Sequence, residues 1–573
     1  MASSIAVCRL HMTRRVRLVK SLQKVETFLQ RSIGTDVVAA QPEAPTRDES
    51  DEKGGCKSLH ALQVERQEQA ARSVLINCQS RTREKTLLKY LSSHGDIKNY
   101  FFYESDDLYA VVEFAKRENV ASLLEGAIIP SGSHESAVPF KSRLLTLRNL
   151  HTAKSPNQQS GQQCQVQTAF PITELIKNLS REDSIDQQIT SLTETYQLTE
   201  ENTRLRFLVC SLLNDITAAY FPECTIKPFG SSVNGFGKLG CDLDMFLDLD
   251  GISGWNPKSG LFLEYQMKQA SSARAVTQNI LYVIGECVDQ FGPGCTRVLK
   301  ILNARIPLVR FSHKPSGFQC DLTANNRVAM KSTELLYLYG ELDPRVRGLV
   351  FTVRCWARTQ GITSGMPGAW ITNFSLTVMV LFFLQKRSPP IIPTLDHLRD
   401  LAGPADKCVI EGNDCTFVSD FSKIQLQSNT ETLEQLLREF FEFYGTFQFS
   451  KMSLSIRKGQ EMNKPEMGPL HIENPFETSL NVSKNVNTSQ LDRFVALCQE
   501  SSWLLQQSET NKPKVNEDSY NVLPWGLATL LLPSQVATIN TRKKKRREPA
   551  SARIKSLLES LKNKNEPKMS EGL

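Results

Sequence analysis

A short run in which acidic and apolar residues alternate constrains this chain more than any other feature. Residues 241–250 read CDLDMFLDLD, so aspartates stand at four of the five even-numbered positions. In a β-strand, side chains two positions apart project to the same face of the sheet. The run therefore predicts a strand whose leucines and methionine face a core, with Asp242 and Asp244 side by side on the opposite face.

The carboxylates of Asp242 and Asp244 need compensation, because two adjacent negative charges repel each other unless protons or cations are present. Oxygen ligands of this kind suit Mg²⁺, which takes one or two carboxylates together with substrate phosphates. The plainer alternative is an acidic strand on the protein surface. We interpret Asp248 and Asp250 in that plainer way, as a solvated strand end, because GISG follows them.

A turn of small residues precedes this strand. Gly230, Ser231 and Ser232 offer backbone amides and hydroxyls that could cradle a phosphate. A phosphate-binding turn that leads into a metal-binding D-x-D strand is a layout for nucleotidyl transfer. A third carboxylate is then needed on a neighbouring strand, and Asp321 within GFQCDLTANN supplies it. The alternative for Asp321 is an ordinary turn or strand-end position.

The chain is too long for one core, since 573 residues predict two to four domains. Its net charge of +7 is compatible with a polyanionic partner without proving one. The 14 cysteines are scattered without a C-x-x-C pair, so we expect reduced thiols in an intracellular compartment. The longest apolar run, 378–384, is far shorter than a membrane span of about 18 residues, and we expect no membrane association.

The N-terminus has the composition of a targeting segment. Residues 1–40 are rich in Arg, poor in acids before Asp36, and carry leucines at helical spacing. This pattern is typical of a mitochondrial transit peptide, and an ordinary basic helix is the alternative. Acidic residues gather in TRDESDEKGG, 46–55, which predicts a flexible linker.

The next segment, 60–150, predicts a small domain with the order strand, helix, two strands, helix, strand. This order resembles an RNA-recognition-motif domain, which stacks bases on aromatic residues of its two central strands. Here Leu75 and Val111 stand where such aromatic residues are usual. We therefore favour a sheet used for packing or dimerisation over one that binds RNA, because stacking needs the missing rings.

Further along, a Gln- and Ser-rich linker is predicted at 151–170, with helices and then the acidic strand region at 171–335. Residues 336–506 are mostly helical in pattern. In this part, six apolar residues from Leu433 to Tyr444 fall on one helix face, which predicts a core helix. A C-terminal segment, 507–573, contains the basic run RKKKRR, which could bind RNA phosphates, act as a nuclear signal or be a solvated charge run.

The turn and the three aspartates together resemble the DNA polymerase β-like nucleotidyltransferase superfamily. Three later motifs resemble those of non-templated RNA 3′-nucleotidyltransferases, namely the helix after the palm, the base-stacking turn and helix, and the nucleotide-recognition motif. They are DPRVRGLVFTVRCWARTQGI at 343–362, ITNFSLTVMVLFFLQ at 371–385 and LHIENPFETSLNVSKNV at 470–486. The likeness covers roughly 170 to 500, and the flanking segments make the chain resemble the mitochondrial members of the poly(A) polymerase and terminal nucleotidyltransferase family.

The resemblance implies a multi-domain α+β fold, with a mixed-sheet nucleotidyltransferase palm and a helical central domain after the RNA-recognition-like domain. It implies template-independent addition of adenylates from ATP to the 3′ ends of mitochondrial RNAs in the matrix, by a homodimer joined through the first domain. Asp242, Asp244 and Asp321 would hold two Mg²⁺ or Mn²⁺ ions. The alternatives are a terminal uridylyltransferase, adenylylation of a small molecule, or a catalytically inactive RNA-binding scaffold.

The same resemblance implies a set of nucleotide contacts. The triphosphate would meet the turn at Gly230, Ser231 and Ser232, and a helix that presents Arg354 and Arg358 one turn apart where most relatives have lysines. Three further positions depart from the usual family residue. They are Phe374, which replaces a Tyr that stacks on the base; Asn373, which replaces a triphosphate-binding Ser; and Ser332, which replaces an Asn that contacts the ribose.

Base choice is expected to rest on IENPFETSLNV, 472–482. Relatives that add uridine carry a His just before the Asn of this motif, whereas Leu480 precedes Asn481 here. A leucine cannot supply the ring hydrogen bond that favours uracil, so we expect ATP to be preferred. Glu473 and Asn474 are weaker candidates that could simply cap the loop.

Overall fold

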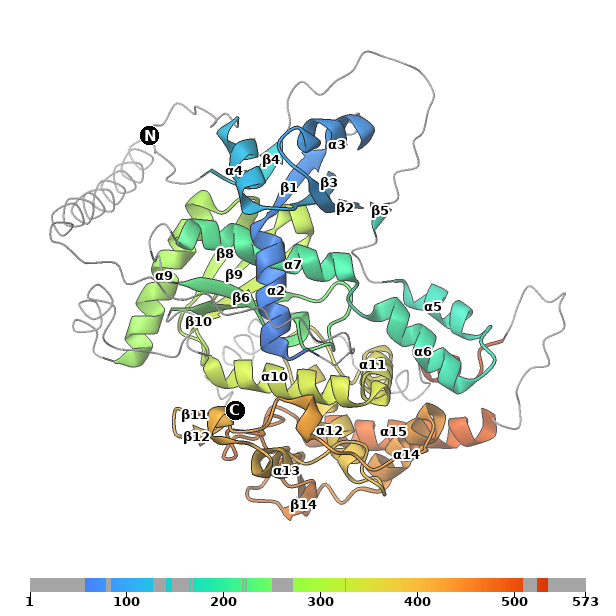
Figure 1. Cartoon of the computed structure of the whole chain (residues 1–573). Helices are drawn as coiled ribbons and strands as arrows, with labels where there is room; N and C mark the ends of the chain where they lie inside the picture. Colours follow the sequence, from blue (N-terminus) through green and yellow to red (C-terminus); the bar gives the residue numbers. More distant parts are fainter. Residues whose placement is uncertain are drawn as a thin grey trace, which may run out of the picture. The chain divides into compact units, whose positions relative to one another are not determined.

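The computed structural model has the mixed α+β architecture expected from the sequence (Figure 1). The chain divides into two compact units, 1–55 and 56–573, and the described residues all belong to the second. The predicted transit peptide, the acidic linker and the basic run at 542–547 lie outside the described residues. The structure describes residues 57–78, 84–126, 141–146, 164–165, 170–218, 221, 224–249, 272–324, 326–508 and 523–533.

The first sheet confirms the predicted order of strands and helices. Its five strands run β4-β1-β3-β2-β5, with β1 antiparallel to β3 and parallel to β4. A helix that the sequence pattern had not indicated, α2, precedes the sheet and packs against α7 of the next region. The elements are α2 (Leu59–Ala71), β1 (Ser73–Cys78), α3 (Glu84–Ser92), β2 (Ile97–Glu104), β3 (Leu108–Phe114), α4 (Arg117–Glu125), β4 (Leu144–Thr146) and β5 (Cys164–Gln165).

One face of this sheet is buried against the next region of the chain. Leu75 and Val111 are paired across β1 and β3 and share a hydrophobic cluster with residues of α7 (Glu200–Thr217). Tyr103 belongs to the same cluster, is fully buried, and donates a hydrogen bond from its hydroxyl to the carbonyl of Pro315 at 2.9 Å. The face on which an RNA-recognition motif would stack bases is therefore covered, which supports the packing interpretation.

The second sheet has the strand order β6-β7-β10-β9-β8, in which only β7 and β10 run parallel. Helices α7 and α9 contribute to the core on one face, where Ile284 of α9 is buried with Met245 and Val309 of the strands. Strand β8 and helix α9 were not predicted. The elements are α5 (Ile172–Leu179), α6 (Ile185–Tyr196), β6 (Thr225–Pro228), β7 (Leu243–Asp248), α9 (Ala273–Phe291), β8 (Cys295–Ile301), β9 (Leu308–His313) and β10 (Phe318–Ala324).

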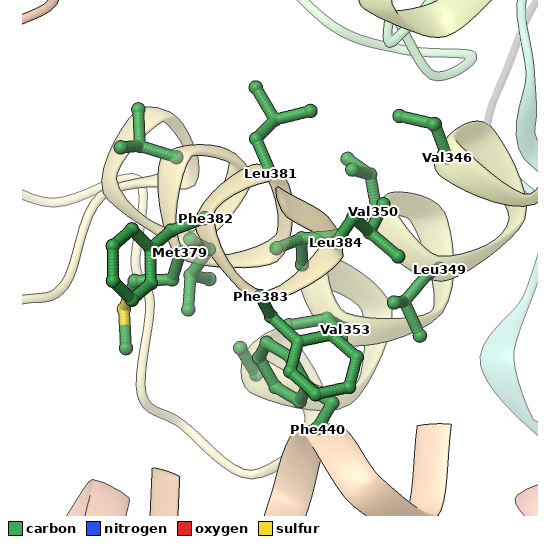
Figure 2. Packing of buried hydrophobic residues seen from close by; sticks show 14 of the residues in the cluster. Val346, Leu349, Val350, Val353, Met379, Leu381, Phe382, Phe383, Leu384 and Phe440 are labelled. Carbon is green, nitrogen blue, oxygen red and sulfur yellow. The ribbon is translucent and has the colours of Figure 1, made fainter. Parts of the chain in front are cut away.

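The remaining elements are mainly helical, as the pattern predicted. Figure 2 shows how Phe383 of α12 meets Val353 of α11 and Phe440 of α14 in the core of this part. Helix α12 is apolar around its whole circumference because it is buried on all sides from Ser375 to Gln385. The helices are α10 (Arg327–Leu342), α11 (Pro344–Thr359), α12 (Asn373–Gln385), α13 (Leu395–Asp400), α14 (Leu433–Thr446), α15 (Thr488–Ser508) and α16 (Leu527–Leu530).

Two features of these helices bear on the sequence predictions. The predicted core helix is α14, in which Leu436, Phe440 and Tyr444 are fully buried. The apolar run 378–384 lies inside α12 and is core rather than membrane surface. Over the described residues, no helix is both long enough and apolar enough to span a bilayer.

Two tyrosines of β2 test whether the first sheet is built into the fold of the second region. Tyr103 is buried in the shared cluster, whereas Tyr100 is 41% exposed. We expect Tyr103→Ala to lower the free energy of unfolding by about 3–5 kcal/mol, because it opens a cavity and leaves the Pro315 carbonyl unpaired. Tyr100→Ala is the control and should cost about 1 kcal/mol or less. Thermal and urea unfolding of the full chain would measure both, and equal losses would contradict a buried contact.

Candidate active site

The small-residue turn lies directly against the acidic strand. The backbone amide of Phe229 donates to the carbonyl of Asp244 at 3.0 Å, and the short 3₁₀ helix Gly230–Ser232 follows. Gly230 has φ +61°, and a Cβ there would stand 3.2 Å from Oδ2 of Asp244. The position requires glycine on both counts, since only glycine adopts this backbone conformation without strain and leaves the carboxylate room.

Two of the three predicted carboxylates, Asp244 and Asp321, lie side by side in the second sheet. Strands β7 and β10 pair in parallel with Asp321 opposite Asp244, so both side chains lie on the same face of the sheet. Asp242 is the residue before β7 and is exposed. Asp321 is also paired across β9 with Arg310, whose Nε and Nη2 donate to its two carboxylate oxygens at 2.7 and 2.6 Å.

The carboxylates strongly influence one another. Burial, followed by the charges of Asp321 and Asp242, raises the pKa of Asp244 to about 7. Burial and the charge of Asp321 also raise the pKa of Asp242. The hydrogen bonds to Asp321 raise the pKa of Arg310. Ionised carboxylates this close to one another favour the binding of positive ions.

The carboxylate oxygens of Asp242, Asp244 and Asp321 are of the ligand type that hard divalent cations prefer. In the described part of the chain, no three His, Cys, Asp or Glu side chains are grouped so that they could hold a metal ion. At Asp321, Arg310 donates to both carboxylate oxygens. The guanidinium thus supplies there the positive charge that an ion would supply.

A buried arginine ties the turn to the acidic strand. Arg206 of α7 is 0% exposed and donates to Oγ of Ser232 at 3.0 Å and to the carbonyl of Asp242 at 2.9 Å. It also donates to the carbonyl of Cys241 at 2.8 Å and to Oδ1 of Asn202 at 2.8 Å. Its guanidinium lies 4.6 Å from the ring centre of Phe318. No sequence motif pointed to Arg206, because its role depends on a contact between a helix and a loop.

A lysine, Lys238, lies close to the two predicted arginines of α11. Arg354 donates to the carbonyl of Phe236 at 2.7 Å, and burial lowers its pKa to about 10. It therefore holds the backbone of the glycine-rich loop 233–240, whereas Arg358 is exposed. Lys238 of that loop is half-buried, and burial together with the charges of Arg358 and Arg354 lowers its pKa. Lys238 was not predicted, and a lone basic residue in a glycine-rich loop before the acidic strand was the available signal.

Asp248 corrects one interpretation made from the sequence. Its carboxylate accepts from Nζ of Lys227 at 2.9 Å, and its side chain is only 14% exposed. The residue is thus paired across β6 and β7 rather than solvated at a strand end. Asp250 lies outside the described residues.

The loop expected to choose the base is held by its asparagine. Asn481 is buried; its Oδ1 accepts from the amides of Ile472 and Ser483, and its Nδ2 donates to the carbonyl of Leu470. The neighbouring Leu480 is half-buried. Both ends of the Asn481 amide are therefore engaged within the loop, so that this side chain positions Leu480. Glu473 and Asn474 also bond within this region, to the hydroxyl of Ser455 and to the amide of Phe476.

The other residues predicted to contact the nucleotide lie on helices α10 and α12. Ser332 donates to the carbonyl of Val328 in its own helix, and its neighbour Thr333 accepts from the amide of Gly230 at 3.0 Å. Asn373 is exposed as the first residue of α12, and Phe374 is partly buried against the helical core. Thr333 was missed at the sequence level although it adjoins a predicted residue.

Three family models match the chain. Residues 58–128 match the RL domain, and residues 185–341 match the central palm domain of the poly(A) RNA polymerase, mitochondrial-like family. Residues 432–483 match the Cid1 family poly A polymerase model. The matches thus cover strands β1 to β3 of the first sheet, the carboxylate-bearing sheet and the loop 472–482.

Curated relatives and solved structures agree with these models. The chain is 53% identical to the mouse (Mus musculus) mitochondrial poly(A) RNA polymerase over 98% of its own length and 95% of that protein. It is 54% identical to the human (Homo sapiens) protein over 91% of this chain and 89% of that one. A crystal structure of mtPAP in complex with ATPγS, 54% identical, covers 83% of this chain and all of that chain with a TM-score of 0.74. A structure of mtPAP with UTP, also 54% identical, covers the same shares with a TM-score of 0.75. The chain therefore belongs to the mitochondrial poly(A) RNA polymerase family.

Proposed function

We propose that this chain adds adenylates from ATP, without a template, to the 3′ ends of RNAs in the mitochondrial matrix. It is a mitochondrial enzyme of the poly(A) polymerase class that acts on RNA with ATP as substrate. The observation that supports this chemistry is the pairing of Asp321 with Asp244 beside the Gly230 turn. The paired strands thereby bring Asp321 and Asp244 to one face of the sheet, next to the Gly230 turn.

Different residues of the chain would have different roles in the nucleotidyl transfer. Asp242, Asp244 and Asp321 would hold two Mg²⁺ or Mn²⁺ ions, which supply activation of the attacking oxygen and stabilisation of the leaving pyrophosphate. Asp321 would also help to take the proton of the RNA 3′-hydroxyl. Arg206 keeps Ser232 and the backbone of Asp242 at a fixed separation, so that the phosphate turn and the carboxylates move as one unit.

The triphosphate would lie over the turn and the basic side chains beside it. Gly230, Ser231 and Ser232 would contact it through backbone amides and hydroxyls. Arg358 and Lys238 supply charge from the helix and from the loop, and burial together with the charge of Arg358 lowers the pKa of Lys238. Arg354 contributes mainly by fixing the loop backbone, because it donates to the Phe236 carbonyl.

The base and ribose would meet residues of the helical part. Phe374 would stack on the base, which does not require the hydroxyl of a tyrosine. Asn373 would face the phosphates and Ser332 the ribose. Leu480, positioned by Asn481, would favour adenine by lacking the hydrogen bond that a histidine offers to uracil. The uridylyltransferase alternative thus depends on this one position.

A homodimer joined through the first domain is the proposed assembly. The sheet face of Leu75 and Val111 is not available for it, because that face is buried within one chain. The contact must then use the opposite side or the edges of this domain. A chain shortened to remove the domain would not test the proposal cleanly, since the removal would expose the apolar face of α7.

The first prediction concerns the carboxylate that completes the site. We expect Asp321→Asn to lower adenylate incorporation into RNA by at least about 10²-fold, because a charge that stabilises the transition state is lost. Primer extension with labelled RNA and ATP would measure the effect, with Mg²⁺, with Mn²⁺ and with a chelator. The parent chain should be active only with a divalent ion.

Asp248→Asn is the matched control, because it removes a carboxylate from the same strand as Asp244 at a position paired with Lys227. It should retain most of the activity. Full activity of Asp321→Asn, or equal loss in the two variants, would refute the assignment of the site. Circular dichroism and thermal unfolding would show that both variants are folded.

The second prediction concerns base choice. We expect the parent chain to incorporate ATP in preference to UTP when each nucleotide is offered alone. Leu480→His should shift the ratio of kcat/KM for UTP over that for ATP by roughly 5- to 150-fold, because leaving a buried hydrogen-bonding group unpaired costs about 1–3 kcal/mol. Leu480→Met is the control and should leave the ratio unchanged. Preference of the parent chain for UTP would favour the uridylyltransferase alternative instead.

The third prediction concerns assembly. Light scattering on the full chain should give about twice the 64.4 kDa of one chain. Chemical cross-linking should join the first domains of two copies through exposed lysines such as Lys85 and Lys89. A mass of one chain at micromolar concentration, or cross-links confined to the helical part, would contradict a dimer joined through the first domain.

A further inference from the structure

We propose that the open face of the second sheet, from Arg310 to the edge strand β8, is the surface on which the 3′-terminal stretch of single-stranded RNA lies. The proposal rests on the polyadenylation function and assigns a place to its RNA substrate. We call this surface the β8–β9 face, and we define it by the side chains of Arg297, Leu299, Ile301, Arg305 and Arg310.

The register of the sheet places this face next to the reacting groups. Asp321 is paired with Arg310, and Arg310 is paired with Leu299, so the three side chains form a row on one side of the sheet. Neighbouring strands are about 4.8 Å apart, which puts Leu299 on the order of 10 Å from Asp321. An RNA strand whose 3′-hydroxyl reaches Asp321 can therefore continue along this row.

The face is open, whereas the opposite side of the same strands is covered. Leu299 is 57% exposed and Ile301 37%. Lys300, which points the other way, contacts Glu286 of α9 at 2.7 Å. Two aliphatic residues are thus exposed two positions apart on the same side of this strand.

The charge of this region matches a polyanion. Arg297, Arg305 and Arg310 belong to this face, and residues 295–313 contain no Asp or Glu. The side chain of Arg305 is 71% exposed and lies 4.0 Å from the carboxylate of Glu477 in the base-choice loop. Arg305 therefore stands between the edge of the sheet and the loop that carries Leu480. Arginines beside exposed apolar side chains suit single-stranded nucleic acid, in which phosphates and base faces are both accessible.

The edge itself is poorly suited to pairing with a strand of a second copy. Strand β8 has a register shift between Thr296 and Leu299, and Arg297 adopts φ +56°. Such a bulge interrupts the row of free backbone groups that strand addition requires. The same bulge leaves the side chain of Arg297 exposed. The geometry therefore favours a partner that binds side chains of the face over one that extends the sheet.

The test measures RNA binding by the full chain without ATP or divalent ions, using the fluorescence anisotropy of labelled single-stranded oligoadenylate over a range of salt concentrations. For the double variant Arg297→Gln/Arg305→Gln, we expect weaker binding and a slope of log K against log salt that is smaller by about 1.4, since each phosphate contact of a single strand contributes about 0.7. Leu299→Ser should weaken binding without changing the slope, because it removes an apolar contact and no charge.

The control is Lys407→Gln/Lys458→Gln, which removes the same charge from exposed positions of the helical part. It should bind RNA like the parent chain. In extension assays, the variants of the face should raise KM for RNA several-fold and leave KM for ATP unchanged. The proposal would be overturned if the variants of the face bound RNA with the same affinity and salt slope as the control. It would also be overturned if those variants bound RNA normally but had a lower molecular mass than the parent chain in light scattering, because the face would then be a contact between two copies. Failure of the parent chain to extend RNA would instead refute the function, and the binding assay would still decide the surface.

Discussion

The buried guanidinium of Arg206 is the interaction on which the geometry of the site depends. A fully buried charge is costly unless all its donors are satisfied, and here they are satisfied largely by the backbone of Cys241 and Asp242 and by Ser232. The turn and the strand can therefore not separate without leaving a charge unpaired in the core. This links the packing of α7 directly to the distance between the phosphate turn and the carboxylates.

The second sheet then sets the positions of the carboxylates through its register alone. Because β7 and β10 are parallel neighbours, a shift by one residue would turn either Asp244 or Asp321 into the core. Burial of Met245 and Leu322 on the opposite face opposes such a shift. The hydrophobic core behind the carboxylates thus keeps them close together although they repel each other. Arg310 reduces this repulsion at Asp321.

Many of the helices and strands could be predicted from the local pattern of apolar and polar residues. The period of two in CDLDMFLDLD and the apolar face of α14 were sufficient for those elements, and the order of the first sheet followed from alternating strands and helices. Strand β8 was missed because its exposed leucine and isoleucine break the usual alternation of polar and apolar faces. Arg206 was missed because the residues that it joins are distant in sequence. The pairing of Asp248 with Lys227 likewise depends on a neighbouring strand that its own sequence does not reveal.

The two sheets differ in which of their faces is covered. The first resembles an RNA-binding sheet, yet its central face is buried, with Leu75 fully buried and Val111 4% exposed. The second has its core on one side and leaves Leu299 and Arg310 open on the other. An RNA strand must bring its 3′ end to Asp321, so a surface in register with that residue can guide it without a separate domain. The first sheet has aliphatic residues where stacking aromatics would stand, and these residues are buried. The second sheet leaves aliphatic residues exposed, and these are available to RNA bases.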